Sequence, residues 1–147
     1  MSANLLFLYG PSGSGKTRML QTIAESIRKV QDTLMVDSER IVEEMAKSVT
    51  SRDYTGFFDR YAHIRNLLID NLWILQSRPS AAKEIGRLIK ARMAQGNLTI
   101  LASDLKREDV IHILPAIGDC LKEESAIQLR LIQAGSEAIE LRYPDHK

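Results

Sequence analysis

The chain of 147 residues has one cysteine, no long apolar run and no marked excess of charge of either sign. Cys120 alone cannot form an internal disulfide, and no Cys and His residues show the spacing of a zinc site. No apolar run approaches the roughly 20 residues that cross a bilayer. The N-terminus has neither the basic start nor the cleavage site of a signal peptide. These absences favour a cytoplasmic protein without a membrane partner.

The balance of charge limits the kinds of partner. Lys and Arg number 20 against 19 Asp and Glu, a net charge of +1. This excludes the strongly basic surface that nonspecific nucleic-acid binding usually needs, although it leaves room for a local patch. The length suits one sheet with its covering helices, and no repeat, low-complexity segment or linker divides it. We therefore expect residues 1–147 to form a single domain.

Apolar runs and helical patterns alternate along the chain. Strands are predicted at four mostly apolar runs, residues 4–9, 33–37, 64–70 and 98–102. Helical spacing predicts helices between and after them, at residues 16–30, 38–49, 57–61, 79–95 and 106–114. Near the C-terminus, residues 126–132 and 138–143 read as two strands of an antiparallel edge hairpin. The alternation indicates an α/β fold with a mainly parallel sheet.

The strongest motif is GPSGSGKT at residues 10–17, between the first predicted strand and the first predicted helix. This is the phosphate-loop pattern in the structural context that it requires. Glycines let the backbone aim its N–H groups at a phosphate, and the helix N-terminus adds partial positive charge. Lys16 is expected to reach the β- and γ-phosphates, and the Thr17 hydroxyl to ligate Mg²⁺. The predicted nucleotide-binding residues of this segment are Gly10, Pro11, Ser12, Gly13, Ser14, Gly15, Lys16, Thr17 and Arg18.

An acidic residue ends the third predicted strand. Asp70 follows the apolar run LLI and is placed to hold Mg²⁺ opposite the phosphate loop. The next residue is Asn71, whose amide can orient a water molecule but cannot accept its proton. If hydrolysis occurs, Asp37 or Glu39 after the second strand is an alternative base. Glu39 also fits a simpler role at the start of the following helix.

Polar side chains also end the fourth predicted strand. Ser103 and Asp104 lie where a side chain can sense a γ-phosphate held between the phosphate loop and Asp70. Either residue also suits a capping role for the helix predicted from Lys106. Both roles are compatible with one another.

Four segments together resemble the DnaA-type replication initiators of the AAA+ ATPases: LFLYGPSGSGKTRML, LMVDSERIVEEM, FFDRYAHIRNLLIDNLWIL and TILASD. They follow one another in the family's order over residues 4–104. The resemblance implies a three-layer αβα P-loop NTPase with strand order 5-1-4-3-2, to which the hairpin is added. It implies ATP or ADP with Mg²⁺, Lys16 and Asp70 as catalytic residues, and Thr17 and Asp70 at the metal. Asp104 or Ser103 would be the first sensor.

The sequence also departs from the family pattern. Asn71 replaces a second acid, which counts against rapid hydrolysis. The segment 115–125 has no arginine to reach the ATP of a neighbouring subunit, and the family's helical lid and double-strand DNA-binding domain have no counterpart here. We expect the ATPase core alone, with its adenine side open to solvent or to a partner.

The function expected from these features is ATP or ADP binding by a regulatory or accessory module of DNA replication or a related DNA transaction, with weak or absent hydrolysis. A protein of the replication machinery would be its partner. In the family, the paired helices between the second and third strands contact single-stranded DNA. Here they are residues 41–63, with Arg52 and Arg60 available for phosphates. The alternatives are an active ATPase motor subunit on DNA and a small-molecule P-loop kinase.

Overall fold

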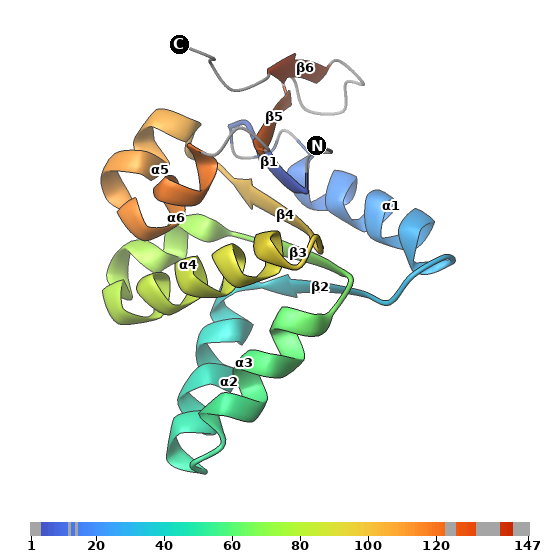
Figure 1. The fold of residues 1–147 in the computed structure, drawn as a ribbon. Coiled ribbons are helices and arrows are strands. Elements are labelled where there is room, and N and C mark those ends of the chain that lie inside the picture. Colours follow the sequence, from blue (N-terminus) through green and yellow to red (C-terminus); the bar gives the residue numbers. More distant parts are fainter. Residues whose placement is uncertain (1–3, 12, 14, 123–125, 132–138, 143–147) are drawn as a thin grey trace.

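The computed structural model describes residues 4–11, 13, 15–122, 126–131 and 139–142, the last two ranges by their backbone alone. One six-stranded sheet crosses the molecule in the order β2-β3-β4-β1-β5-β6 (Figure 1). The strands are β1 (Leu5–Tyr9), β2 (Thr33–Asp37), β3 (Asn66–Asp70), β4 (Leu98–Ser103), β5 (Ala126–Leu131) and β6 (Ile139–Arg142). All neighbours are parallel except β5 and β6. The predicted α/β fold with a mainly parallel sheet is confirmed. Its order differs in one detail, because strand 5 of the order 5-1-4-3-2 is the first strand of the hairpin and the hairpin is not added beyond it.

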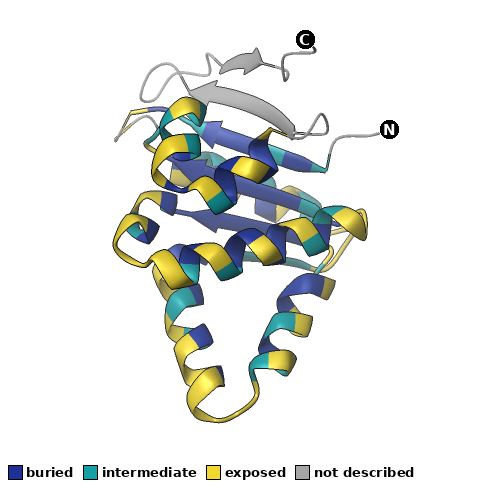
Figure 2. Ribbon diagram, turned by 60° about the vertical axis from the view of Figure 1, so that its left-hand side comes forward, coloured by how far each residue is buried: buried dark blue, intermediate teal, exposed yellow. Residues whose placement is uncertain are grey.

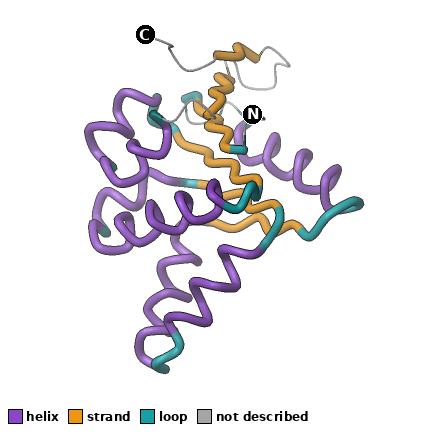
Figure 3. Tube along the Cα trace, viewed as in Figure 1, coloured by secondary structure: helices purple, strands orange, loops and turns teal. Residues whose placement is uncertain are grey.

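Helices cover both faces of this sheet (Figure 3). They are α1 (Lys16–Arg28), α2 (Ser38–Thr50), α3 (Tyr54–His63), the 3₁₀-helix η1 (Leu72–Ser77), α4 (Pro79–Ala94), α5 (Arg107–Ile113) and α6 (Pro115–Leu121). Helix α1 packs on one face against β2, β3 and β4. Helices α4, α5 and α6 form the opposite layer, and α2 and α3 project as a hairpin from the β2 edge (Figure 1). Of the helices described, none is long and apolar enough to cross a membrane.

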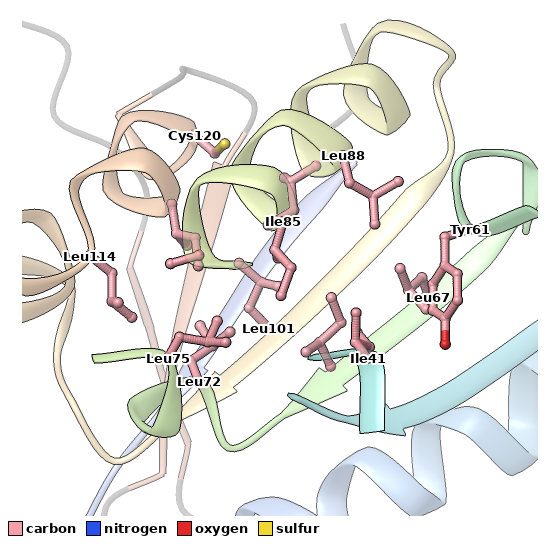
Figure 4. Packing of buried hydrophobic residues seen from close by; sticks show 14 of the residues in the cluster. Ile41, Tyr61, Leu67, Leu72, Leu75, Ile85, Leu88, Leu101, Leu114 and Cys120 are labelled. Carbon is pink, nitrogen blue, oxygen red and sulfur yellow. The ribbon is translucent and has the colours of Figure 1, made fainter. Parts of the chain in front are cut away.

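Alternating side chains of the strands form two separate cores. On the α4 side, Phe7, Leu67 and Leu101 are buried against residues of the helices, including Ile85 and Leu88 (Figure 4). On the α1 side, a smaller cluster contains Leu8, Leu20, Ala24, Leu68, Ile100 and Ala102. Strands β1, β3 and β4 are consequently buried on both faces, as their apolar runs predict, whereas β2 is mostly half-buried (Figure 2).

The α2–α3 hairpin is joined to itself and to the layer of α4 by polar contacts. The Tyr61 hydroxyl of α3 donates to Glu44 Oε1 of α2 at 2.9 Å. Burial and this contact with Glu44 raise the pKa of Tyr61. The Tyr54 hydroxyl donates to Glu84 of α4, and the Arg87 guanidinium lies 4.1 Å above the centre of the Phe58 ring. These contacts join α2 to α3 and the first half of α3 to α4.

Arg92 of α4 is fully buried beneath the α3–β3 turn. Its guanidinium donates hydrogen bonds of 2.6 Å to the carbonyls of Tyr61, Ile64 and Leu98, and one of 2.9 Å to the Thr99 hydroxyl. Burial lowers the pKa of Arg92 to about 10. The side chain thus ties the C-terminal end of α3 to the start of β4.

The structure corrects some sequence predictions. The first helix, predicted at residues 16–30, ends at Arg28, and Val30 beyond it is 83% exposed. The sequence did not predict η1 or α6. Residue Lys106 precedes α5 as its N-cap without a side-chain hydrogen bond, so the predicted capping by Ser103 or Asp104 is wrong. The Ser103 hydroxyl accepts from the Leu105 N–H instead, at 2.9 Å.

Candidate nucleotide-binding site

The phosphate-loop segment connects the end of β1 directly to α1. Gly13 and Gly15 have φ angles of +82° and +93°, a left-handed conformation that favours glycine. Gly15 is the N-cap of α1, and its carbonyl accepts the Met19 N–H at 2.9 Å. The first turn of α1 has no acidic residue of its own. The predicted Ser12 and Ser14 lie outside the described residues.

Lys16 is buried at the start of α1, with 7% of its surface exposed. Its ammonium donates to the carbonyls of Gly10 and Pro11 at 2.8 and 2.9 Å. It also pairs with Asp104 Oδ1 at 2.7 Å. The structure therefore brings Asp104, the residue that follows β4, to the loop lysine.

Thr17 and Asp70 meet across the carboxyl edge of the sheet. The Thr17 hydroxyl donates to Asp70 Oδ2 at 2.7 Å, and the Asn71 N–H donates to Asp70 Oδ1 at 2.9 Å. The Ser38 hydroxyl fixes the Asp70 carbonyl at 2.9 Å. Asp70 is consequently buried and oriented toward the first turn of α1.

This pair of oxygen donors fits Mg²⁺. The ion prefers hard oxygen ligands and is usually held by one or two carboxylates together with phosphates of the ligand. Among the described residues, no group of three or more His, Cys, Asp or Glu side chains is placed to hold a metal ion. Thr17 and Asp70 therefore suit a metal shared with a nucleotide better than a site made by protein alone.

Asn71 has a left-handed backbone with a φ of +58°, a conformation that asparagine adopts more readily than most residues. Its side-chain amide donates to Asp37 Oδ2, and Asp37 Oδ1 accepts the Glu39 N–H at 2.9 Å. Asp37 and Asp70 are register partners at the ends of β2 and β3. Two carboxylates with one amide between them thus end these strands.

The remaining predicted residues lie around this centre. Ser103 is buried at the end of β4, and Arg18 is exposed on the first turn of α1. Glu39 is exposed and borders a groove of about 180 Å³ between α2 and η1. The catalytic, nucleotide and metal roles of all these residues remain predictions.

Sequence reasoning missed two contacts of the site. It assigned Ser38 only to the helix start, whereas the Ser38 hydroxyl holds the Asp70 carbonyl. It also did not pair Asp37 with Asn71. Both contacts join residues more than 30 positions apart, and the only signal was that polar residues end two neighbouring parallel strands.

Comparison with known proteins finds relatives among bacterial DnaA proteins. The family model described as the bacterial DnaA ATPase domain matches residues 1–124. The chromosomal replication initiator protein DnaA of Buchnera aphidicola subsp. Baizongia pistaciae is 31% identical over 104 residues, which are 69% of this chain and 23% of that protein. The DnaA of Francisella tularensis subsp. novicida is also 31% identical over 104 residues, again 69% of this chain but 21% of that protein. The chain thus spans less than a quarter of the length of these relatives.

Solved structures share the fold. Domain III of the Thermotoga maritima replication initiation protein DnaA superposes with a TM-score of 0.79 at 20% identity, covering 88% of this chain and 55% of that one. A replication initiator DnaA bound to AMPPCP and single-stranded DNA gives 0.76 at 19% identity, covering 85% and 40%. Because the family model spans most of the chain, and the phosphate loop and Asp70 lie in its matched part, this chain belongs to the bacterial DnaA ATPase-domain family.

Proposed function

We propose that residues 1–147 act as one nucleotide-binding unit that holds ATP or ADP with Mg²⁺ and serves as a regulatory or accessory module in replication initiation. The phosphate loop would cradle the phosphates with its N–H groups and Lys16. Thr17 and Asp70 would hold the metal ion, which when bound neutralises charge on the phosphates. Asp104 would respond to the phosphates through its contact with Lys16.

One observation carries this proposal. Lys16 and Thr17 begin α1 directly after the phosphate loop, and the Thr17 hydroxyl meets the Asp70 carboxylate at the end of β3 at 2.7 Å. This arrangement does not stabilise the hydrophobic core, because burying a cation and a carboxylate at the edge of the sheet costs free energy. Its chemistry suits a magnesium nucleotide.

Slow turnover is part of the proposal. Asn71 lies next to Asp70 and, as an amide, cannot take a proton from the attacking water. We expect steady-state ATP turnover well below about one per second, the low end of typical enzymes. This separates the proposed function from an active ATPase motor.

The test is an equilibrium titration with a fluorescent ADP analogue, together with ATP turnover. Wild-type protein should bind saturably at one site, and Lys16→Ala should weaken binding at least about tenfold, since it removes a charge-assisted contact to the phosphates. Lys90→Ala, an exposed lysine of α4, is the control and should bind as wild type does. Turnover of one per second or faster that Lys16→Ala abolishes would sink the slow-turnover proposal. Phosphoryl transfer to an added small-molecule acceptor would favour the kinase.

Single-stranded DNA is a proposed partner of the α2–α3 hairpin. One structural neighbour is a DnaA bound to single-stranded DNA, and the hairpin projects from the sheet with an exposed outer surface (Figure 2). Residues 41–63 carry three Lys and Arg against four Asp and Glu, so any contact with phosphates must be local. Charge reversal at Arg52 and Arg60 should weaken salt-dependent binding of an oligonucleotide. Absence of binding by the wild type at low salt would remove DNA from the proposed partners.

A further inference from the structure

Asp37 is both the last residue of β2 and the N-cap of α2. It ends β2 beside Asp70 on β3, and both strands are parallel, so their final side chains meet at the edge where the phosphate loop lies. Asp37 is half-buried there. The ends of β2 and β3 thus carry two carboxylates, although the residue that follows Asp70 in sequence is an amide.

The hydrogen bonds fix the orientation of this carboxylate. Asp37 Oδ1 accepts the Glu39 N–H, and Asp37 Oδ2 accepts the Asn71 amide. A carboxylate accepts only, so the NH₂ group of Asn71 must face Asp37 and its carbonyl oxygen must lie on the other branch of the amide. Both donors are neutral, and each carboxylate oxygen keeps a further lone pair for a water molecule.

Asp70 is held for a different task. Its two oxygens accept from the Thr17 hydroxyl and from the Asn71 N–H, which direct it toward the first turn of α1. Asn71 therefore contacts both carboxylates, one through its backbone and the other through its side chain. The two carboxylates thus have different partners, since Asp70 faces Thr17 and Asp37 faces the Asn71 side chain.

We propose that Asp37, held by Asn71, accepts the proton of the water that attacks ATP. The inference rests on the proposed nucleotide-binding function and names the base for its slow turnover. The water oxygen forms a bond to the γ-phosphorus while the bond from that phosphorus to the bridging oxygen breaks. ADP leaves with the electron pair of the broken bond, and the water proton passes to Asp37 and then to solvent.

The two residues permit an exchange test with little disturbance of the fold. Asn caps helices as well as Asp, so Asp37→Asn keeps an acceptor for the Glu39 N–H. Asp tolerates a left-handed backbone nearly as Asn does, so Asn71→Asp is compatible with the turn. The double variant Asp37→Asn with Asn71→Asp contains the same amide and carboxylate in exchanged places. Glu43→Gln, an exposed acid of α2, is the charge control.

The ligand-free proteins test the pairing. Asn71→Asp alone places two carboxylates in contact and should lower the unfolding midpoint, whereas adding Asp37→Asn should restore most of the loss. The loss should be absent in Glu43→Gln. Equal midpoints in all variants, or losses that simply add, would overturn the pairing of Asp37 with Asn71.

Nucleotide binding and turnover test the role. Asp37→Asn should bind the fluorescent ADP analogue within about threefold of wild type but turn ATP over about 100-fold more slowly, the usual contribution of a positioned base. The exchanged variant should recover turnover. The proposal is overturned if Asp37→Asn turns over within twofold of wild type, if it loses affinity as much as turnover, or if wild-type turnover does not exceed that of Lys16→Ala. None of these outcomes requires nucleotide binding to fail, which is the separate test of the proposed function.

Discussion

Replacing Arg92 by methionine tests how the β-sheet is joined to the projecting hairpin. The guanidinium satisfies three carbonyl oxygens at 2.6 Å and the Thr99 hydroxyl at 2.9 Å, and Met fills similar volume without a donor. Each acceptor left without its partner costs about 1–3 kcal/mol, and the loss is offset because a cation no longer has to be buried. We expect Arg92→Met to lower the free energy of unfolding by about 3 kcal/mol, a large part of the roughly 5–15 kcal/mol of a typical domain.

The assay is chemical denaturation at 25 °C with thermal unfolding beside it. A loss of about 3 kcal/mol corresponds to a fall of roughly 6–12 °C in Tm for a domain of this size. Arg92→Lys should fall between the wild type and Arg92→Met, because an ammonium keeps the charge but not the planar fork of donors. Lys90→Met, on the exposed side of the same helix, should change stability by less than about 0.5 kcal/mol. A change below about 1 kcal/mol in Arg92→Met would refute the reasoning.

The difference between Arg92→Met and wild type should also have a defined dependence on pH. Burial places the pKa of Arg92 at about 10 in the folded protein, below its ordinary value of 12.5. Between these values the unfolded chain binds more protons, so the contribution of this group to stability rises with pH only above about 10. The stability difference should therefore be constant from pH 6 to 9, and a slope there would contradict the assigned cause.

Other predictions concern packing and the loop. A methyl group on Gly86 would lie 2.7 Å from the backbone carbonyl of Ala116, so Gly86→Ala should cost about 1–3 kcal/mol in chemical denaturation, and an unchanged midpoint would argue against close contact of α4 and α6. Tyr61→Phe should cost about 1 kcal/mol through the lost hydrogen bond to Glu44, and a cost below a few tenths would show that this bond contributes little. Gly15→Ala forces a side chain into a left-handed conformation at the α1 N-cap and should weaken ADP binding, whereas wild-type affinity would mean that the loop accepts another conformation.

The parts of the fold that sequence predicts best are those with local causes. The strand at residues 33–37 has the predicted bounds, and the long helix stops before Gly96, whose φ of +76° suits a residue past a helix end. The sequence did not predict η1 in the short apolar segment after Asp70, because the periodicity of so short a run does not distinguish a strand from a helix.

In the site, too, the features with local causes were predicted and the contacts between distant residues were not. The phosphate loop and Asp70 are recognisable because their chemistry lies in short motifs at strand ends. The pairing of Asn71 with Asp37 depends on the register of β2 and β3, which only the sheet determines. Arg92 lies within the helix predicted at residues 79–95, but the carbonyls of Tyr61 and Leu98 that accept from it belong to α3 and β4, which the helical pattern does not reveal. Contacts of this kind need the tertiary structure.

The most direct test of the account measures how Mg²⁺ changes the affinity for ATP in wild type, Thr17→Val and Asp70→Asn. If Thr17 and Asp70 hold a metal shared with the phosphates, Mg²⁺ should tighten ATP binding by the wild type, and each variant should lose most of that gain. Exposed Thr50→Val on α2 should keep it. The same magnesium dependence in Thr17→Val and Asp70→Asn as in wild type, or no saturable binding of ATP by the wild type, would contradict the central claim.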